Sequence, residues 1–385
     1  MGNLYKRTAL AADMADKVLF TSPTSASSSG LFLAAPRRTG KSTFLREDLR
    51  PQLEARGALV VYVDLWENKQ TDSGEAIASV IRAELTRHDG VLKRLAKTTG
   101  LDKVSVAGTS FSLNRLGLAQ GVSLSAALCA LSDEVSKPIV LIIDEAQHAI
   151  TTDGGGNALF ALKAARDELN SSRHKGLRVV ATGSNQDKLA MLRNSKEQAF
   201  FGAPLVKFPA LGKDYLAWFC EHAKLGAPLD PNRVAELFAA AAFRPEILGA
   251  AADTLRFEFG IDPGDIAARF DAEVQHEIIS ANAEALRVIR SLTPLQSAVL
   301  NVLAKAGTNY APFEAKTLEN YQAVMQAAAP QSEVRADIPN VQQALVALQD
   351  KGLVWKAARG VYALEDTSLA DLLNAMPGNT DGAHP

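Results

Sequence analysis

An apolar run that gives way to Gly-Lys-Ser-Thr constrains the fold of this chain most strongly. Residues 30–35 have the composition of a short buried strand, and Phe44, Leu45 and Leu49 fall on one face of a helix expected at 43–49. The sequence APRRTGKST therefore lies between a strand and a helix, which is where a phosphate-binding loop occurs. Backbone N–H groups at a helix start are unpaired and carry the positive end of the helix dipole, so they suit a triphosphate.

Individual residues of this loop have distinct expected roles. Gly40 lets the backbone approach a phosphate, Lys41 can place its charge between the β- and γ-phosphates, and the Ser42 hydroxyl can ligate Mg²⁺. Ala35 stands where the usual pattern has its first glycine, and an alanine fits there if its φ angle is negative. The predicted nucleotide-binding residues are Ala35, Pro36, Arg37, Arg38, Thr39, Gly40, Lys41, Ser42 and Thr43. The motif implies a P-loop NTPase, and we expect a Mg²⁺-dependent ATPase with Lys41 also among its catalytic residues.

Two adjacent carboxylates follow a second apolar run, PIVLIIDEAQH, at residues 138–148. Such a run is typical of a central parallel strand, which delivers its last side chains to the carboxyl edge of the sheet. Asp144 is expected to hold Mg²⁺ together with Ser42, and Glu145 to polarise the attacking water. We expect His148 to be structural, and we expect the tract TTDGGGN at 151–157 to be a mobile loop whose glycines form turns.

Three further segments complete a predicted sheet of five parallel strands. Residues 58–66, 177–185 and 204–211 are apolar and short, and helical patterns separate the strands, which predicts a doubly wound α/β core. The fourth of the five strands, at 177–185, ends at Ser184 and Asn185, which would arrive beside the γ-phosphate, although a simple strand-end turn is the alternative. Residues 103–114 alternate polar and apolar side chains, as a half-exposed strand or hairpin arm would.

The remainder of the chain predicts two more units. From Asp214 to about Leu292 the apolar spacing is helical, which predicts an all-α lid, and Arg244 in this lid could touch the phosphates or be a solvated residue before Pro245. Residues 291–373 predict three helices and then a β-hairpin, the order of a winged helix. The predicted domains are an N-terminal segment and linker at 1–29, a P-loop core at 30–212, a helical lid at 213–290, a winged helix at 291–373 and a flexible tail at 374–385.

Composition limits the possible partners. The 385 residues carry a formal net charge of −2, so no overall basic field exists and any contact with duplex DNA must come from a local patch. Lys351, Lys356 and Arg359 form such a patch around the predicted hairpin. No uninterrupted apolar stretch of about 18 residues and no signal-peptide core occur, so we expect a cytoplasmic protein without a membrane partner.

The motifs APRRTGKST, VLIIDEAQH and VVATGSN, with a C-terminal winged helix, resemble the AAA+-type ATPases of the archaeal ATPase and STAND-related group over most of the chain from about residue 30. Origin-recognition initiators are more distant relatives. The resemblance implies that Asn185 lies near sensor 1 and acts in catalysis. Relatives often carry an arginine finger in a Gly-Arg step after sensor 1, but Ala203 follows Gly202 here, which leaves Arg193 as the substitute candidate.

These observations predict an ATP-binding and ATP-hydrolysing molecular switch whose nucleotide state controls the winged helix. The leading role is a DNA transaction of the mobile-element or defence type, carried out by a nucleotide-dependent homo-oligomer. The alternative is a STAND-like signalling or scaffold ATPase whose winged helix binds a protein partner. A metabolic kinase is disfavoured because the sequence offers no acceptor site.

Overall fold

The computed structural model describes residues 4–20, 30–68, 70–88, 90, 123–171, 173–184, 186–194, 198–331, 333–358, 360–366 and 368–375. Two compact units make up the chain: Lys6–Ala35 with Lys41–Phe208, and Pro209–Pro385 with Met1–Tyr5 and Pro36–Gly40. The predicted hairpin arm at 103–114, Asn185 and Arg359 lie outside the described residues, as do most of the predicted linker and tail.

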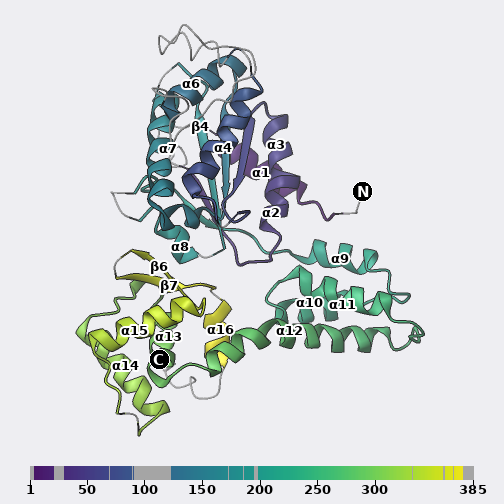
Figure 1. The fold of residues 1–385 in the computed structure, drawn as a ribbon. Coiled ribbons are helices and arrows are strands. Elements are labelled where there is room, and N and C mark those ends of the chain that lie inside the picture. The colour runs from purple at the N-terminus through teal and green to yellow at the C-terminus, as the bar shows by residue number, and fades with distance from the viewer. Residues whose placement is uncertain are drawn as a thin grey trace. The chain divides into compact units, whose positions relative to one another are not determined.

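A five-stranded parallel sheet in the order β2-β3-β4-β1-β5 forms the centre of the unit that contains residues 41–208 (Figure 1). The strands are β1 (Leu31–Ala34), β2 (Leu59–Asp64), β3 (Ile139–Asp144), β4 (Leu177–Gly183) and β5 (Leu205–Lys207). Asp64 is in register with Asp144, and Leu33 with Thr182, so the carboxyl ends of four strands reach one edge. The predicted α/β fold class with five parallel strands is confirmed.

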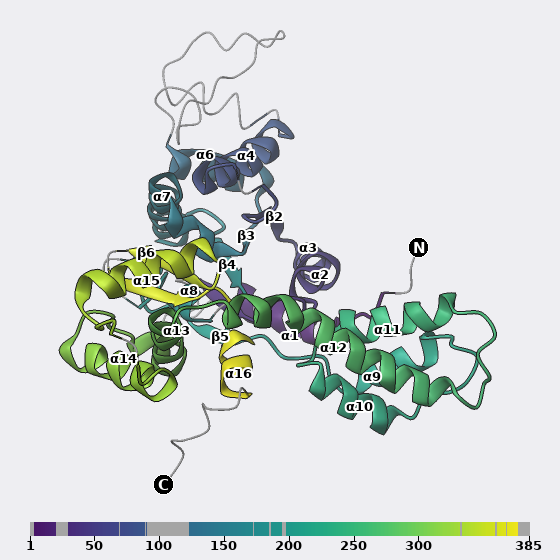
Figure 2. The ribbon, with the colours of Figure 1, turned by 60° about the horizontal axis from the view of Figure 1, so that its bottom comes forward.

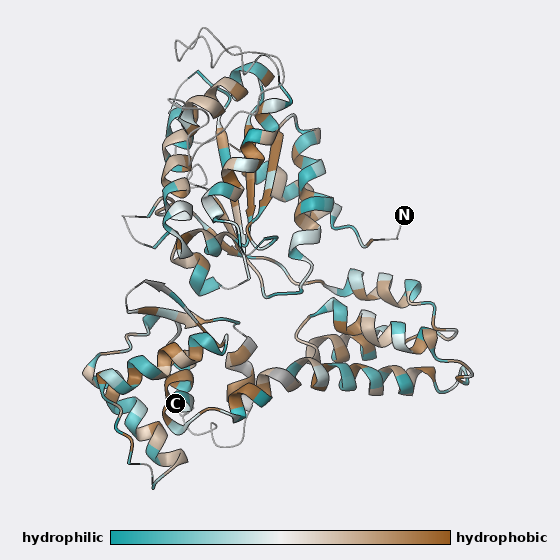
Figure 3. Cartoon of the chain, in the orientation of Figure 1, coloured by the Kyte–Doolittle hydropathy of each residue, from teal (hydrophilic) through white to brown (hydrophobic). Residues whose placement is uncertain are grey.

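Both faces of the sheet are covered by helices, which is why β3 is apolar at consecutive positions. Ile139, Leu141 and Ile143 belong to the core on one face, whereas Val140 and Ile142 belong to the core on the other. The first face packs against α4 (Ser73–Thr86), α6 (Leu124–Val135) and α7 (Asp153–Ser171), and the second against α1 (Thr8–Leu19), α2 (Lys41–Phe44), η2 (Leu45–Leu49) and α3 (Arg50–Ala55). Figure 2 shows α4, α6 and α7 grouped together, and Figure 3 shows the strands between the helices in the brown of apolar residues.

The glycine tract at 151–157 is not a loop, so that expectation was wrong. The 3₁₀ segment η3 (Ala146–Thr151) leads directly into α7, whose first turn contains Gly154 and Gly155. A Cβ atom on Gly155 would lie 2.1 Å from the Ala149 carbonyl oxygen, and one on Gly154 would lie 2.3 Å from the Asp72 carboxylate. These glycines therefore permit close packing of the helix start rather than a turn.

Four helices with a shared apolar core form the first part of the other unit. They are α9 (Lys213–His222), α10 (Pro231–Ala240), α11 (Pro245–Phe257) and α12 (Ile266–Arg290). Tyr215, Phe238, Leu248 and Phe270 are among the buried side chains of this core. These helices form the all-α region that the sequence predicted after the sheet.

The last part of the chain has three helices followed by an antiparallel hairpin, which is the predicted order. Its elements are α13 (Pro294–Ala306), η4 (Gly307–Asn309), α14 (Ala315–Ala328), α15 (Ile338–Asp350), β6 (Val354–Ala358), β7 (Val361–Leu364) and α16 (Ser368–Ala375). Thr293 caps α13 in a capping box with Gln296, and Pro294 takes the first helical position. No helix among the described residues is long and apolar enough to cross a membrane. The exact domain boundaries stay predictions.

Candidate nucleotide-binding site

The segment from Ala35 to Gly40 joins β1 to α2 through a sharply turned backbone. Ala35 does not have a positive φ angle, which is the condition for alanine at this position, and its N–H donates to the Gly183 carbonyl oxygen at 3.1 Å. Arg38 and Gly40 have left-handed φ angles of 63° and 82°. A Cβ atom on Gly40 would meet no atom within 4 Å, so glycine is needed there for its backbone conformation and not for space.

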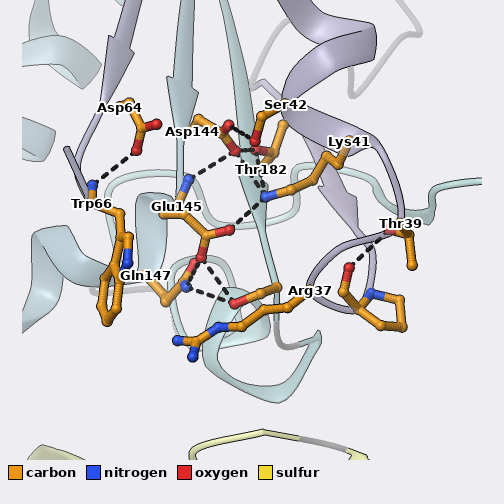
Figure 4. A network of polar contacts seen from close by, with 12 residues as sticks. Arg37, Thr39, Lys41, Ser42, Asp64, Trp66, Asp144, Glu145, Gln147 and Thr182 are labelled. Carbon is orange, nitrogen blue, oxygen red and sulfur yellow. Dashed lines mark hydrogen bonds and ion pairs between the residues drawn. The ribbon is translucent and has the colours of Figure 1, made fainter. Parts of the chain in front are cut away.

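Lys41 lies at the centre of a buried ionic cluster (Figure 4). Its Nζ atom is 2.8 Å from Asp144 Oδ1 and 2.8 Å from Glu145 Oε1, and it also donates to Thr182 Oγ1 at 3.3 Å. The Lys41 side chain is 5% exposed and the Asp144 side chain 0% exposed, so little water screens their attraction. The start of α2 and the end of β3 thus bring together the lysine and both acids that the sequence predicted.

Asp144 accepts hydrogen bonds at both carboxylate oxygens. Ser42 Oγ donates to Oδ2 at 2.6 Å, Tyr62 OH donates to the same oxygen at 3.0 Å, and Thr182 Oγ1 donates to Oδ1. Burial favours the neutral acid, but the Lys41 charge and the hydrogen bonds from Lys41, Ser42 and Thr182 outweigh it and lower the pKa of Asp144 to about 2. Asp144 is therefore an anion at neutral pH.

Glu145 follows directly in a left-handed conformation, with φ 54° and ψ 41°, and η3 begins after it. Its Oε2 atom accepts hydrogen bonds from Gln147 Nε2 at 2.6 Å and from Ser184 Oγ at 2.9 Å. Burial opposes ionisation here too, but the Lys41 charge, with hydrogen bonds from Lys41, Gln147 and Ser184, lowers the pKa of Glu145. The cluster therefore holds two carboxylates and one ammonium group.

The position of β4 between β1 and β3 explains two members of this cluster. Thr182, near the end of β4, and Ser184, directly after it, therefore lie beside Asp144 and Glu145 at the end of β3. The sequence predicts Ser184 beside the phosphates but not Thr182 or Tyr62, because threonine and tyrosine are ordinary strand residues. Gln147 lies in the VLIIDEAQH motif, but the sequence alone predicts no role for it.

Other predicted site residues have contacts elsewhere. Arg193 Nε donates to the Ala203 carbonyl oxygen, and Arg193 NH1 is 3.3 Å from Asn194 Oδ1, so the described contacts of this guanidinium lie within its own loop. Arg244 is the N-cap residue of α11, and its Nε donates to the Ala241 carbonyl oxygen at 3.0 Å. Thr39 Oγ1 donates to the Pro36 carbonyl oxygen at 2.8 Å, and Thr43 is exposed in α2. The finger role of Arg193 and the phosphate role of Arg244 stay predictions.

Comparison with known proteins supports the fold. No protein-family model matches the chain, and no curated protein matches it. Among solved structures, the chain is similar to the ORC2 protein of Aeropyrum pernix in its ADP form, with 16% identity, 97% of this chain and 94% of that chain covered, and a TM-score of 0.51. It is also similar to a Walker-type ATPase of Pyrococcus abyssi, with 18% identity, 95% of each chain covered and a TM-score of 0.48. At this identity, the similarity to ORC2 shows a shared fold.

Replacing Lys41 with alanine should destabilise the nucleotide-free protein in a pH-dependent way. The change leaves Asp144 buried without its cation, and loss of one partner from a buried ion pair costs about 3–5 kcal/mol. In the wild type, the folded pKa of Asp144 lies below the unfolded value of about 3.9, so this group stabilises the fold above that pH. In the variant, burial should raise the folded pKa above the unfolded value, so the destabilisation should grow as pH rises from about 4 to about 7.

Urea unfolding at several pH values measures this difference. Adding Asp144→Asn to Lys41→Ala should recover part of the loss at neutral pH, because the uncompensated charge is gone. Lys17→Ala is the matched control, since it removes an exposed lysine that pairs with Asp13, and it should cost less than about 1 kcal/mol. A loss of stability in Lys41→Ala that does not change with pH would contradict the buried ionic cluster.

Proposed function

We propose that this chain is a Mg²⁺-dependent ATPase and that its nucleotide state acts as a molecular switch. The buried Lys41 ammonium beside two carboxylates, directly after a turned loop at a strand-to-helix junction, carries this proposal. A lysine in this position can exchange its carboxylate partners for phosphate oxygens, which carry at least as much negative charge. The ORC2 protein that shares the fold is described in an ADP form, which is consistent with a nucleotide in this one.

The side chains around Asp144 fit a magnesium–nucleotide complex. Mg²⁺ prefers hard oxygen ligands and usually combines one or two protein oxygens with phosphate and water. Ser42 Oγ and Asp144 Oδ2 are 2.6 Å apart at the same edge of the sheet, and the lowered pKa keeps Asp144 anionic. We therefore assign Ser42 and Asp144 to the metal and Lys41 to the β- and γ-phosphates.

Glu145 is the proposed base for the attacking water. It is the second of the two acids, it is anionic, and its Oε1 atom pairs with the same Lys41 ammonium that pairs with Asp144 Oδ1. A positioned carboxylate can accept a proton from water that attacks the γ-phosphate. We also propose that Asn185 and Arg244 lie beside the phosphates. Arg193 is the proposed arginine finger for the nucleotide of a neighbouring subunit.

Two substitutions separate binding from hydrolysis. Lys41→Ala should abolish or severely weaken ATP binding, because the phosphates lose their buried cation. Glu145→Gln should still bind ATP but hydrolyse it at least about a hundredfold more slowly, which is the scale of a lost general base. Calorimetric titration with ATP and Mg²⁺ measures the first effect, phosphate release measures the second, and circular dichroism checks that each variant is folded.

Glu84→Gln is the matched control for Glu145→Gln. It neutralises a largely buried glutamate of α4 that pairs with Arg87, away from the ionic cluster, so turnover should not change. Wild-type ATP affinity in Lys41→Ala would refute the site, and unchanged turnover in Glu145→Gln would move the base to another residue.

We also propose that the C-terminal hairpin contacts the backbone of duplex DNA, as the output of the switch. Lys351 and Lys356 are exposed, Lys351 at the end of α15 and Lys356 on β6, and Arg359 belongs to the turn between β6 and β7 in the sequence. Three such contacts give weak binding that depends on salt and not on base sequence, so useful affinity requires several subunits. A protein partner on the same surface is the second candidate, because residues 291–385 contain nine acidic and six basic side chains.

Charge reversal on the hairpin distinguishes these two partners. Lys356→Glu combined with Arg359→Glu should weaken duplex binding at low salt in the presence of ATP and Mg²⁺, and ATPase activity without DNA should not change. Lys305→Glu combined with Lys316→Glu changes the net charge equally at exposed positions on α13 and α14, so it should leave binding intact. Fluorescence anisotropy measures both. Absence of binding at micromolar protein, or an equal loss in both double variants, would favour the protein partner.

A further inference from the structure

The two carboxylate oxygens of Glu145 have different kinds of partner. Oε1 accepts from the Lys41 ammonium at 2.8 Å, whereas Oε2 accepts from the neutral donors Gln147 Nε2, at 2.6 Å, and Ser184 Oγ, at 2.9 Å. A phosphate that takes Lys41 would remove the donor on Oε1 and leave both donors on Oε2. One oxygen would then be held in place while the other becomes free.

Glu145 has an irregular backbone conformation, so the direction of its side chain depends on these contacts. Its left-handed φ angle of 54° is unfavourable for a residue with a Cβ atom. Glu145 also stands at the junction between β3 and η3, where the regular strand has ended. The direction of its carboxylate is therefore determined by hydrogen bonds rather than by the regular strand.

Gln147 is fully buried, and its amide orientation has an identifiable cause. Nε2 faces Glu145 and also lies 3.4 Å from Ser184 Oγ, while Oε1 has no hydrogen-bond partner among the described residues. Turning the amide over would place Oε1 against the Glu145 carboxylate, so that two acceptors would face each other. Because an unpaired buried oxygen is unfavourable, we attribute this orientation of the amide to its contact with Glu145.

Gly183 makes room for this amide. A Cβ atom on Gly183 would lie 2.4 Å from Gln147 Oε1, so any side chain at the end of β4 would push the amide away. Gly183 also accepts the hydrogen bond from Ala35 N that connects β4 to the exit of β1. The strand that supplies Ser184 thus also fixes the space in which Gln147 lies.

We propose that Gln147 is a positioning residue for Glu145, which holds Oε2 together with Ser184 so that Oε1 faces the attacking water once phosphate has taken Lys41. This inference rests on the ATPase function proposed above. It assigns no contact with the nucleotide to Gln147. Loss of the amide should therefore slow turnover without weakening ATP binding.

The test compares turnover and affinity in Gln147→Met, which keeps the length of the side chain and removes its donor. We expect kcat to fall about ten- to a hundredfold, the scale of a misplaced reacting group, with the ATP dissociation constant unchanged. Ser184→Ala should lower kcat in the same direction. Ser132→Ala is its matched control, because Ser132 is a fully buried serine of α6 that bonds to backbone at Lys137 and Lys175, and it should have no effect on kcat.

A double-mutant cycle shows whether Gln147 acts through Glu145. In a Glu145→Gln background, Gln147→Met should cause no further loss of kcat, because the group that it positions has been replaced. An equal additional loss in that background, or unchanged kcat in both Gln147→Met and Ser184→Ala, would overturn the proposal. If the wild-type protein itself neither binds nor hydrolyses ATP, the proposed function fails instead, so the two failures are distinguishable.

Discussion

The rest of the site depends on the ion pairs that the Lys41 ammonium makes with Asp144 and Glu145. A buried carboxylate and a largely buried one at adjacent positions would repel each other and favour protonation, and the Lys41 ammonium that pairs with both keeps both ionised. A buried cluster of this kind is stable only while each charge has its partner. We propose that a polyphosphate replaces the carboxylates as the partner of Lys41, so that the cation that compensates these acids also serves nucleotide binding.

The order of the strands places every member of this cluster. Because β4 pairs with β3, Thr182 and Ser184 reach Asp144 and Glu145. Two strands contribute to the surroundings of Asp144 from opposite sides, since Tyr62 of β2 donates to one oxygen and Thr182 of β4 to the other. Parallel strands bring all of these side chains to one carboxyl edge, which is where ligands bind in open α/β sheets.

Periodicity predicted the fold well because both faces of the sheet are buried, so each strand is a distinct apolar run. Motif spacing predicted that Lys41, Ser42, Asp144 and Glu145 lie together, as they do, because the chemistry of phosphate and Mg²⁺ requires those residue types at those spacings. Their roles in binding and hydrolysis stay proposals. Local sequence does not contain the order of strands in a sheet, so the contacts of Tyr62 and Thr182 with Asp144, and the partners of Gln147, could not be predicted. The prediction of a loop at 151–157 was wrong for a related reason. Its glycines are needed because the chain packs closely against Ala149 and Asp72, and only the fold brings Asp72 near.

The central claim is that Lys41 passes from the carboxylates to phosphate while Glu145 keeps its neutral partners. A crystal structure with a non-hydrolysable ATP analogue and Mg²⁺ tests this most directly. The account predicts that Lys41 Nζ contacts a phosphate oxygen and has left Glu145 Oε1, and that Gln147 Nε2 and Ser184 Oγ still donate to Oε2. A structure in which Lys41 remains on Glu145 with the nucleotide bound, or in which Gln147 has turned away from Glu145, would contradict it.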